Sequence, residues 1–379
     1  MQKWIVALSL WIGCHIALLG LLVFGGRVFA EQMWRVVRRV VLIVVALYPL
    51  ALLGLMFVQM IWPQDEGVWA VAQIFAPYLF APLFLALPFA LFRHARMLRV
   101  LLMLCALIFI GRFVGLPSFR QPQVPAGAIE ISALNWNLGL GTEQAQISRA
   151  RDILLAKPAD IVVLEEAYWR WIENDPALTV LYPHRRALYY NGETGLVVLS
   201  TYPILHDDVP QPQNGAAAQK HPRQIVARLD VGGTPFNVVA THPPSPQISF
   251  ADRCRLVCYA TADRDQHLAQ LHQVVQPLLD SGEPLLVLGD FNTTIREPIY
   301  RELSAGLREA HATVGSGAGL TWPLPNDSVA FPAWLQLLFP LIRIDHQFSN
   351  ARLTPLATSV DCTLRGSDHC AVWGMYQIK

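Results

Sequence analysis

The apolar residues are distributed unevenly and divide the chain into two parts. Residues 1–120 are almost entirely apolar, whereas residues 128–379 mix apolar and polar positions as globular domains do. A membrane-spanning helix needs about 20 consecutive apolar residues. The first part holds four segments of roughly that length: 4–24, 40–62, 68–92 and 98–113. We therefore expect about four transmembrane helices within residues 1–114, then a linker at 115–127 and a globular domain at 128–379.

The basic residues predict the orientation of these spans. Arginines cluster in the loops after the first and third segments, whereas the loop after the second carries Asp65 and Glu66. Because basic loops stay in the cytoplasm, the globular domain is expected on the extracytoplasmic side of an inner or plasma membrane. A second interpretation makes residues 1–30 a cleaved signal peptide, since Val28-Phe29-Ala30 resembles a cleavage site. It leaves three spans and the same outside domain.

The second part alternates strand-like and helix-like segments. Strands are expected at 129–140, 160–168, 194–204, 224–231, 235–242, 285–288, 342–350 and 370–378, and helices at 143–159 and about 251–280. Hairpins mixed with crossover helices predict two packed sheets flanked by helices, in the α/β or α+β class.

The net charge limits the classes of partner, and the cysteines suggest one disulfide. From Ala128 onward the chain has 19 Lys and Arg against 25 Asp and Glu, a net charge of about −6, which argues against duplex nucleic acid as a partner. Cys362 and Cys370 can pair in an oxidising compartment. Cys254 and Cys258 are spaced for one face of a helix, which is a poor disulfide geometry, and no second pair follows to complete a zinc site.

Polar side chains collect where the expected strands end. The stretches are NWN (135–137), LEE (164–166), THPPSP (241–246), GDFN (289–292), RIDH (343–346) and SDH (367–369). In GDFN, Asp290 and Asn292 point the same way while Phe291 turns toward the core, because side chains alternate along a strand. Carboxylates, amides and imidazoles gathered at one sheet edge suit a hard cation and a phosphate.

The order of these six stretches resembles the endonuclease/exonuclease/phosphatase superfamily of metal-dependent phosphoesterases, over about residues 129–379. The resemblance implies a four-layered sandwich, hydrolysis of a phosphodiester, and Mg²⁺ as cofactor, with Mn²⁺ as an alternative. It assigns metal binding to Glu166, Asp368 and Asn137. It assigns catalysis to Asp290, Asn292, His369, His242 and Asp345, and phosphate binding to Asn137, Asn292 and His369.

Within these roles, Asp290 would activate the attacking water, and His369 beside Asp345 would be a charged imidazolium that binds phosphate. His242 would lie near the leaving group. Glu165 is expected to face away from the site, on the solvent side or supporting it.

Several positions leave alternatives open. Gly139 stands where several nucleases of the superfamily have an acid, which favours a single metal ion. Glu193 is either a partner of His242 or a surface residue. Arg343 and His346 are expected at most to support Asp345.

The substrate is the least determined feature. Segment 321–345 is rich in apolar residues, namely Trp322, Phe331, Trp334, Leu337, Leu338 and Phe339, which either lean on the bilayer or complete the core. We expect a membrane-anchored phosphodiesterase for a lipid or small phosphodiester, with the lipid bilayer as the other partner. The alternatives are a tethered nuclease for DNA or RNA, a non-catalytic binding module, and a transporter with an accessory domain.

Overall fold

The computed structural model describes Gly13, His15 and residues 31–114, 127–139, 143–190, 194–211, 222–249, 258–325, 339–363 and 367–379. The chain forms two compact units. One combines Met1–Trp62 with Ala76–Val114, and the other combines Pro63–Phe75 with Gly115–Lys379.

The first unit is helical. It contains α2 (Glu31–Ile61), the 3₁₀ helix η2 (Ala76–Ala86), α4 (Leu87–Ala90) and α5 (Arg96–Phe113). Within the described residues, one helix is long and apolar enough to cross a membrane, at Val36–Ile61. Gly67–Ile74 and Ala76–Ala90 pass the same test only when they are joined across a break.

The expectation of about four transmembrane helices is therefore not supported. The first expected span, 4–24, lies outside the described residues. The third, 68–92, is interrupted, and its first turns form α3 (Gly67–Ile74), which belongs to the second unit. The fourth coincides with α5, whose 18 residues carry three arginines. The structure gives one candidate span, or two, in the part of the chain it describes.

The second unit is built on two six-stranded sheets. The first has the order β13–β14–β1–β2–β4–β3, and the second has the order β11–β12–β10–β7–β6–β5. The strands of the first sheet are β1 (Glu130–Asn137), β2 (Ile161–Tyr168), β3 (His184–Tyr189), β4 (Thr194–Ser200), β13 (Leu353–Asp361) and β14 (Ala371–Ile378). Those of the second are β5 (Ile204–Asp208), β6 (Gln224–Val231), β7 (Thr234–Thr241), β10 (Leu285–Asp290), β11 (Arg308–Glu309) and β12 (Asp345–Ser349).

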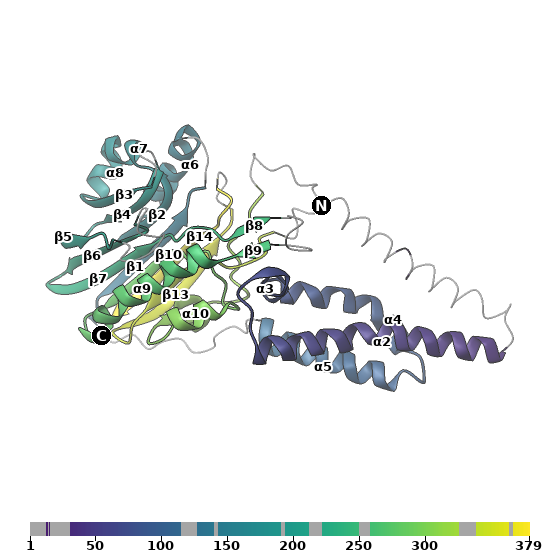
Figure 1. The fold of residues 1–379 in the computed structure, drawn as a ribbon. Helices are drawn as coiled ribbons and strands as arrows, with labels where there is room; N and C mark the ends of the chain where they lie inside the picture. The colour runs from purple at the N-terminus through teal and green to yellow at the C-terminus, as the bar shows by residue number, and fades with distance from the viewer. Residues whose placement is uncertain are drawn as a thin grey trace. The chain divides into compact units, whose positions relative to one another are not determined.

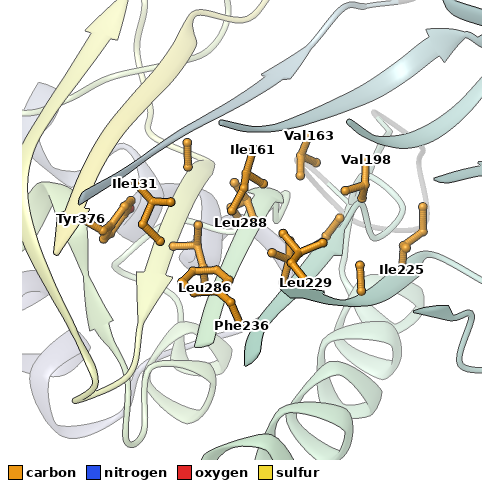
Figure 2. Packing of buried hydrophobic residues seen from close by; sticks show 14 of the residues in the cluster. Ile131, Ile161, Val163, Val198, Ile225, Leu229, Phe236, Leu286, Leu288 and Tyr376 are labelled. Carbon is orange, nitrogen blue, oxygen red and sulfur yellow. The ribbon is translucent and has the colours of Figure 1, made fainter. Parts of the chain in front are cut away.

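Helices cover the outer face of each sheet, so that the unit has four layers (Figure 1). The first sheet packs on α6 (Glu143–Ala156), α7 (Trp169–Asn174) and α8 (Pro176–Leu181). The second packs on α9 (Ala262–Asp280) and α10 (Pro298–Leu303). Between the sheets, side chains such as Ile161, Val163, Leu286 and Leu288 interdigitate in a fully buried core (Figure 2). The expected fold of two mixed sheets flanked by helices is confirmed.

A parallel pair lies in the middle of each sheet. β1 runs parallel to β2, and β7 runs parallel to β10, whereas the remaining pairs are antiparallel. Because the carboxyl ends of parallel strands meet at one edge, the polar residues that follow these four strands are brought together.

The region before α9 differs from the prediction of a helix from about residue 251. Cys258–Ala260 is a short strand, β9, that pairs with β8 (Gln247–Ser249), and α9 begins only at Ala262. Asp263 and Asp265 in its first turn favour a start at that point. The idea that Cys258 lies on a helix face unsuited to a disulfide is therefore wrong, since Cys258 is disulfide-bonded. The expected Cys362–Cys370 disulfide is present.

Candidate active site

The first sheet supplies Asn137 and Glu166. Asn137 is the last residue of β1, where it lies beside Glu165 of β2. The β2–β4 register shifts between Leu164 and Ala167, and Glu166 has a positive φ of 53°. A bulge of this kind redirects a side chain, and the positive φ costs about 1–3 kcal/mol that the surrounding fold must supply. The strained backbone turns the carboxylate of Glu166 into the cleft while Glu165 stays buried.

The second sheet supplies Asp290 and Asp345. These residues are direct partners across the antiparallel β10–β12 pair. The preceding Gly289 has φ +146°, and a Cβ atom there would lie 2.0 Å from the carbonyl oxygen of Thr241. Only glycine therefore lets β7 and β10 approach closely enough to place His242, the residue after β7, beside Asp290. As expected, Phe291 packs into the core beneath the site.

These residues line one cleft of about 410 Å³. Its polar wall contains Asn137, Glu166, Asp290, Asn292, Asp368 and His369. His242 and Asp345 lie directly behind this wall, because the Nε2 atom of His242 is 3.7 Å from the Asp290 carboxylate and Asp345 contacts His369. The structure thus brings together all eight residues that the sequence singled out for the site.

Asp290 is held by a network of donors. The side-chain amide of Asn137 donates to its Oδ2 atom at 3.0 Å, and the backbone N–H of Asn292 donates to its Oδ1 atom at 2.8 Å. Burial raises the pKa of Asp290 to about 7, with a further contribution from the negative charge of Asp345, while the charge of His369 opposes the rise. A carboxylate with this pKa is well matched to accept a proton near neutral pH.

Asn292 holds Asp290 in place. Its Nδ2 atom donates to the Asp290 carboxylate at 3.3 Å and to the carbonyl oxygen of Pro243 at 3.0 Å. Both amide protons are thereby engaged, and the positive φ of 50° at Asn292 is a second strained position in the site. Direct phosphate binding by Asn292 stays a prediction.

The two histidines have opposite charge states. Although burial lowers the pKa of His369, the charges of Asp345 and Asp290 and a 3.0 Å contact between its Nδ1 atom and Asp345 raise it to about 10. His369 is therefore an imidazolium in the cleft. Burial, together with the positive charges of Arg223 and His369, lowers the pKa of His242 to about 3, so His242 is neutral.

One group of side chains with metal-ligand spacing is Asp290, Asp345 and His369, whose ligand atoms all lie within 4.8 Å of one another. The charges of the two aspartates hold His369 protonated, so a cation bound by this cluster would have to displace that proton.

The second candidate metal site consists of Glu166, Asp368 and Asn137. Burial raises the pKa of Glu166, the positive charge of His369 opposes this, and the negative charge of Asp368 adds to the rise. The amide oxygen of Asn137 accepts from the backbone N–H of Gly139, and its amide nitrogen donates to Asp290. The two carboxylates are therefore the hard oxygen donors of this group, and such donors suit a divalent cation. Metal binding by Glu166, Asp368 and Asn137 stays a prediction.

Gly139 is constrained by the same group. Its φ is +70°, and a Cβ atom there would lie 2.8 Å from the Oδ1 atom of Asp368. An acid at this position would therefore displace Asp368, which explains why glycine stands there.

Glu165 does not lie on the solvent side, and it has the supporting position that the expectation also allowed. Its side chain is fully buried, and burial together with the charges of Asp345 and Asp290 raises its pKa far above the usual value. Arg343 and His346 have the supporting position that was expected. Both are buried beside Glu309, each 3.6 Å from its carboxylate. Glu193 and the apolar residues Phe331, Trp334, Leu337 and Leu338 lie outside the described residues.

Some residues around the site were not anticipated. The fully buried Arg264 pairs with Glu297 at 2.5 Å and donates to the carbonyl oxygen of Asn292 at 3.0 Å, which fixes the loop after β10. Arg223 lies over the ring of Tyr190 at 4.1 Å, and its charge lowers the pKa of Glu166. Arg264 and Glu297 are separated by 33 residues, and Arg223 is a lone arginine before a strand. Neither feature has a spacing that indicates its role in the sequence.

Comparisons with known proteins identify the family of the chain. The model of the Endonuclease/Exonuclease/phosphatase family matches residues 134–369. No curated protein matches the chain. Among solved structures, D. rerio TDP2 complexed with single-strand DNA product is similar at 16% identity and a TM-score of 0.50, covering 65% of this chain and 98% of that one.

Two further structures are similar at lower TM-scores. The human nocturnin catalytic domain with bound sulfate has 17% identity and a TM-score of 0.49, over 66% of this chain and 95% of that one. Sphingomyelinase C from Streptomyces griseocarneus has 20% identity and a TM-score of 0.45, over 66% of this chain and all of that one. At these identities the likeness concerns the fold alone.

Proposed function

Because the chain belongs to the endonuclease/exonuclease/phosphatase family, we propose that it is a divalent-metal-dependent phosphodiesterase that uses an activated water. The observation that carries the proposal is the convergence of Glu166, Asp290, Asp368 and His369 on one cleft, although they come from both sheets and from distant parts of the sequence. Members of the family with this chemistry are hydrolases of phosphate esters. The cleft contains a base, Asp290, and a positively charged imidazolium, His369, for that task.

The residues divide the reaction between them. Asp290, with a pKa of about 7, accepts the proton that the attacking water loses as its oxygen bonds to phosphorus. The imidazolium of His369, held by Asp345, binds the phosphoryl oxygens, on which negative charge accumulates as the bond to the leaving oxygen breaks. Asn137 and Asn292 orient Asp290 through their hydrogen bonds.

Glu166, Asp368 and Asn137 would hold the cation, Mg²⁺ or alternatively Mn²⁺. Such an ion supplies Lewis-acid stabilisation of a phosphoryl oxygen. His242 is neutral, and its Nε2 atom lies 3.8 Å from Glu166 and 3.7 Å from Asp290, beyond hydrogen-bonding distance. Its role is to pack beside these two carboxylates rather than to donate a proton.

We further propose that the protein is an integral membrane protein with its catalytic unit outside the cytoplasm. The candidate span Val36–Ile61 supports the anchor. The disulfide between Cys362 and Cys370, together with the disulfide-bonded Cys258, supports an oxidising compartment. A lipid or small phosphodiester is the preferred substrate, because the globular part of the chain carries a net charge of about −6 (19 basic against 25 acidic residues from Ala128).

The test uses the full chain in detergent with Mg²⁺ and bis(p-nitrophenyl) phosphate. We expect hydrolysis that EDTA abolishes and that Asp290→Asn lowers by about 10²–10⁴-fold, because the base is lost. Asp152→Asn, the same change at an exposed position on α6, should leave the rate unchanged. Hydrolysis that survives EDTA, or that survives Asp290→Asn, would refute the proposal.

A further inference from the structure

The cleft has a second wall that the proposed chemistry does not use. Besides the polar residues, the cleft is lined by four isoleucines, Ile74, Ile248, Ile342 and Ile344, and by the aromatic residues Phe75, Tyr259 and Trp322. Most of these residues are aliphatic, and none has a charge or a role in moving protons. A phosphate site needs only a polar lining, so this wall calls for a separate explanation.

Part of the wall comes from outside the region that defines the family. Ile74 and Phe75 lie at the end of α3, whereas the family model begins at residue 134. α3 is nevertheless fixed to the globular unit, because Ala70 and Ile74 pack with Tyr259, Ile342 and Ile344.

Hydrogen bonds add to this attachment. The guanidinium of Arg296 donates to the carbonyl oxygen of Ile74 at 3.1 Å, and the side-chain amide of Gln73 donates to the carbonyl oxygen of Arg296. Gln73 is almost fully buried. The end of α3 is therefore held in one place, as a wall of a binding site must be.

Trp322 joins the two walls. Its indole N–H donates to the Oδ2 atom of Asp368 at 3.1 Å, and its ring centroid is 6.3 Å from that of His369. The apolar surface thus begins next to the residues that would hold the cation and the phosphate. A substrate that fills both surfaces must therefore carry its apolar group only a few bonds from its phosphate.

We propose that the apolar wall is a subsite for the hydrocarbon part of the substrate, and that the substrate is a lipid phosphodiester. The proposal rests on the proposed phosphodiesterase function. An aliphatic wall suits an alkyl or acyl chain, whereas nucleic acid is held by stacking on aromatic rings in a positively charged groove. α3 also begins six positions after Ile61, the end of the candidate span, so the connecting chain reaches at most about 20 Å.

Residues 62–66 connect α3 to the candidate span. We therefore favour a lipid of the surrounding membrane, rather than a soluble phosphodiester, as the substrate. α3 is thereby a specificity element that this chain adds to the family fold. Its part in the reaction is to bind the hydrocarbon next to the phosphate, and the chemistry is left to the polar wall.

The test compares two soluble esters with the same leaving group, methyl p-nitrophenyl phosphate and octyl p-nitrophenyl phosphate, on the full chain in detergent below the concentration at which the octyl ester aggregates. The measured quantity is the ratio of kcat/KM for octyl over methyl. We expect Phe75→Ser to lower this ratio by a factor of about ten. Phe75→Leu should keep most of the wild-type ratio, because leucine is also apolar. Val180→Ser, at an exposed apolar position on α8, should leave both rates and the ratio unchanged.

The ratio separates the possible failures. Loss of folded protein lowers both rates together and leaves the ratio intact, so the ratio reports on the subsite alone. EDTA-sensitive turnover of both esters with an unchanged ratio in Phe75→Ser would overturn the lipid subsite while leaving the phosphodiesterase intact. If neither ester is hydrolysed, the proposed function itself fails. If Phe75→Ser lost turnover of a single-stranded oligonucleotide but kept turnover of both esters, the wall would be a nucleic-acid subsite. This result would also overturn the proposal.

Discussion

Glu309 offers a quantitative test of how the site is supported. It ends β11 and caps α11 (Ala310–Val314), and its side chain is 4% exposed. Arg343 and His346 lie 3.6 Å from its carboxylate, and the Nε2 atom of His346 lies 3.0 Å from the carbonyl oxygen of Thr293 in the loop after β10. Glu309 therefore stabilises two of the stretches that carry site residues.

The magnitude follows from its pKa. Burial alone raises the pKa of Glu309, but the contact with His346 and the charge of Arg343 outweigh it and lower the pKa from 4.5 to about 2. This difference corresponds to about 3 kcal/mol of folding free energy. Because the folded pKa is the lower one, the contribution is complete above pH 4.5 and disappears as the pH falls toward 2. At pH 3 about 1 kcal/mol remains.

The assay is urea unfolding of the wild type and of Glu309→Gln, followed by tryptophan fluorescence at pH 7 and at pH 3. Glutamine keeps the size of the side chain but not its charge. We expect the variant to be less stable by about 3 kcal/mol at pH 7 and by about 1 kcal/mol at pH 3. Glu302→Gln, at an exposed position on α10, should show no such difference at either pH. An equal loss of stability at both pH values for Glu309→Gln would refute the reasoning.

Further predictions concern the other supports of the site. Arg264→Met leaves the buried Glu297 without its partner and should lower the unfolding free energy by about 3–5 kcal/mol, whereas adding Glu297→Gln should recover part of the loss in the same urea titration. Gly289→Ala should prevent folding, seen as loss of the far-ultraviolet circular dichroism of the sheets, because its Cβ atom would overlap a β7 carbonyl oxygen; normal spectra would contradict this. Replacing Cys362 and Cys370 by serine should lower the unfolding free energy by about 2 kcal/mol and reduce activity, and dithiothreitol should slow the wild type more than the double variant, which keeps only the disulfide of Cys258.

The sequence predicted the clustering of these residues because its signals are local. Asp290 and Asn292 follow a run of apolar residues, and side-chain alternation places Phe291 in the core without knowledge of the rest of the chain. The convergence of the strand ends follows from the parallel pairs in the two sheets. All four edge strands of the two sheets, β3, β5, β11 and β13, were missed because edge strands carry polar residues on both faces and lack a clear alternation.

The errors share a different cause, since they depend on contacts between distant residues. The sequence left open whether Glu165 lies on the solvent side or supports the site, because the bulge in β2 cannot be recognised from the order of residues. α3 was taken as part of a span because an apolar helix has the same composition whether it packs on lipid or on protein. A buried pair such as Arg264 and Glu297 has no pattern at all until the chain is folded.

The position of β14 has a consequence for folding of the protein. The last strand of the chain, Ala371–Ile378, is inserted between β13 and β1 in the interior of the first sheet, directly after Asp368 and His369. Because β14 pairs with β1, which lies far away in the sequence, the first sheet is complete only after both strands have been made, and such long-range pairing is slow. Asp368 and His369 therefore reach Asp290 late in folding, when β14 takes its place beside β1.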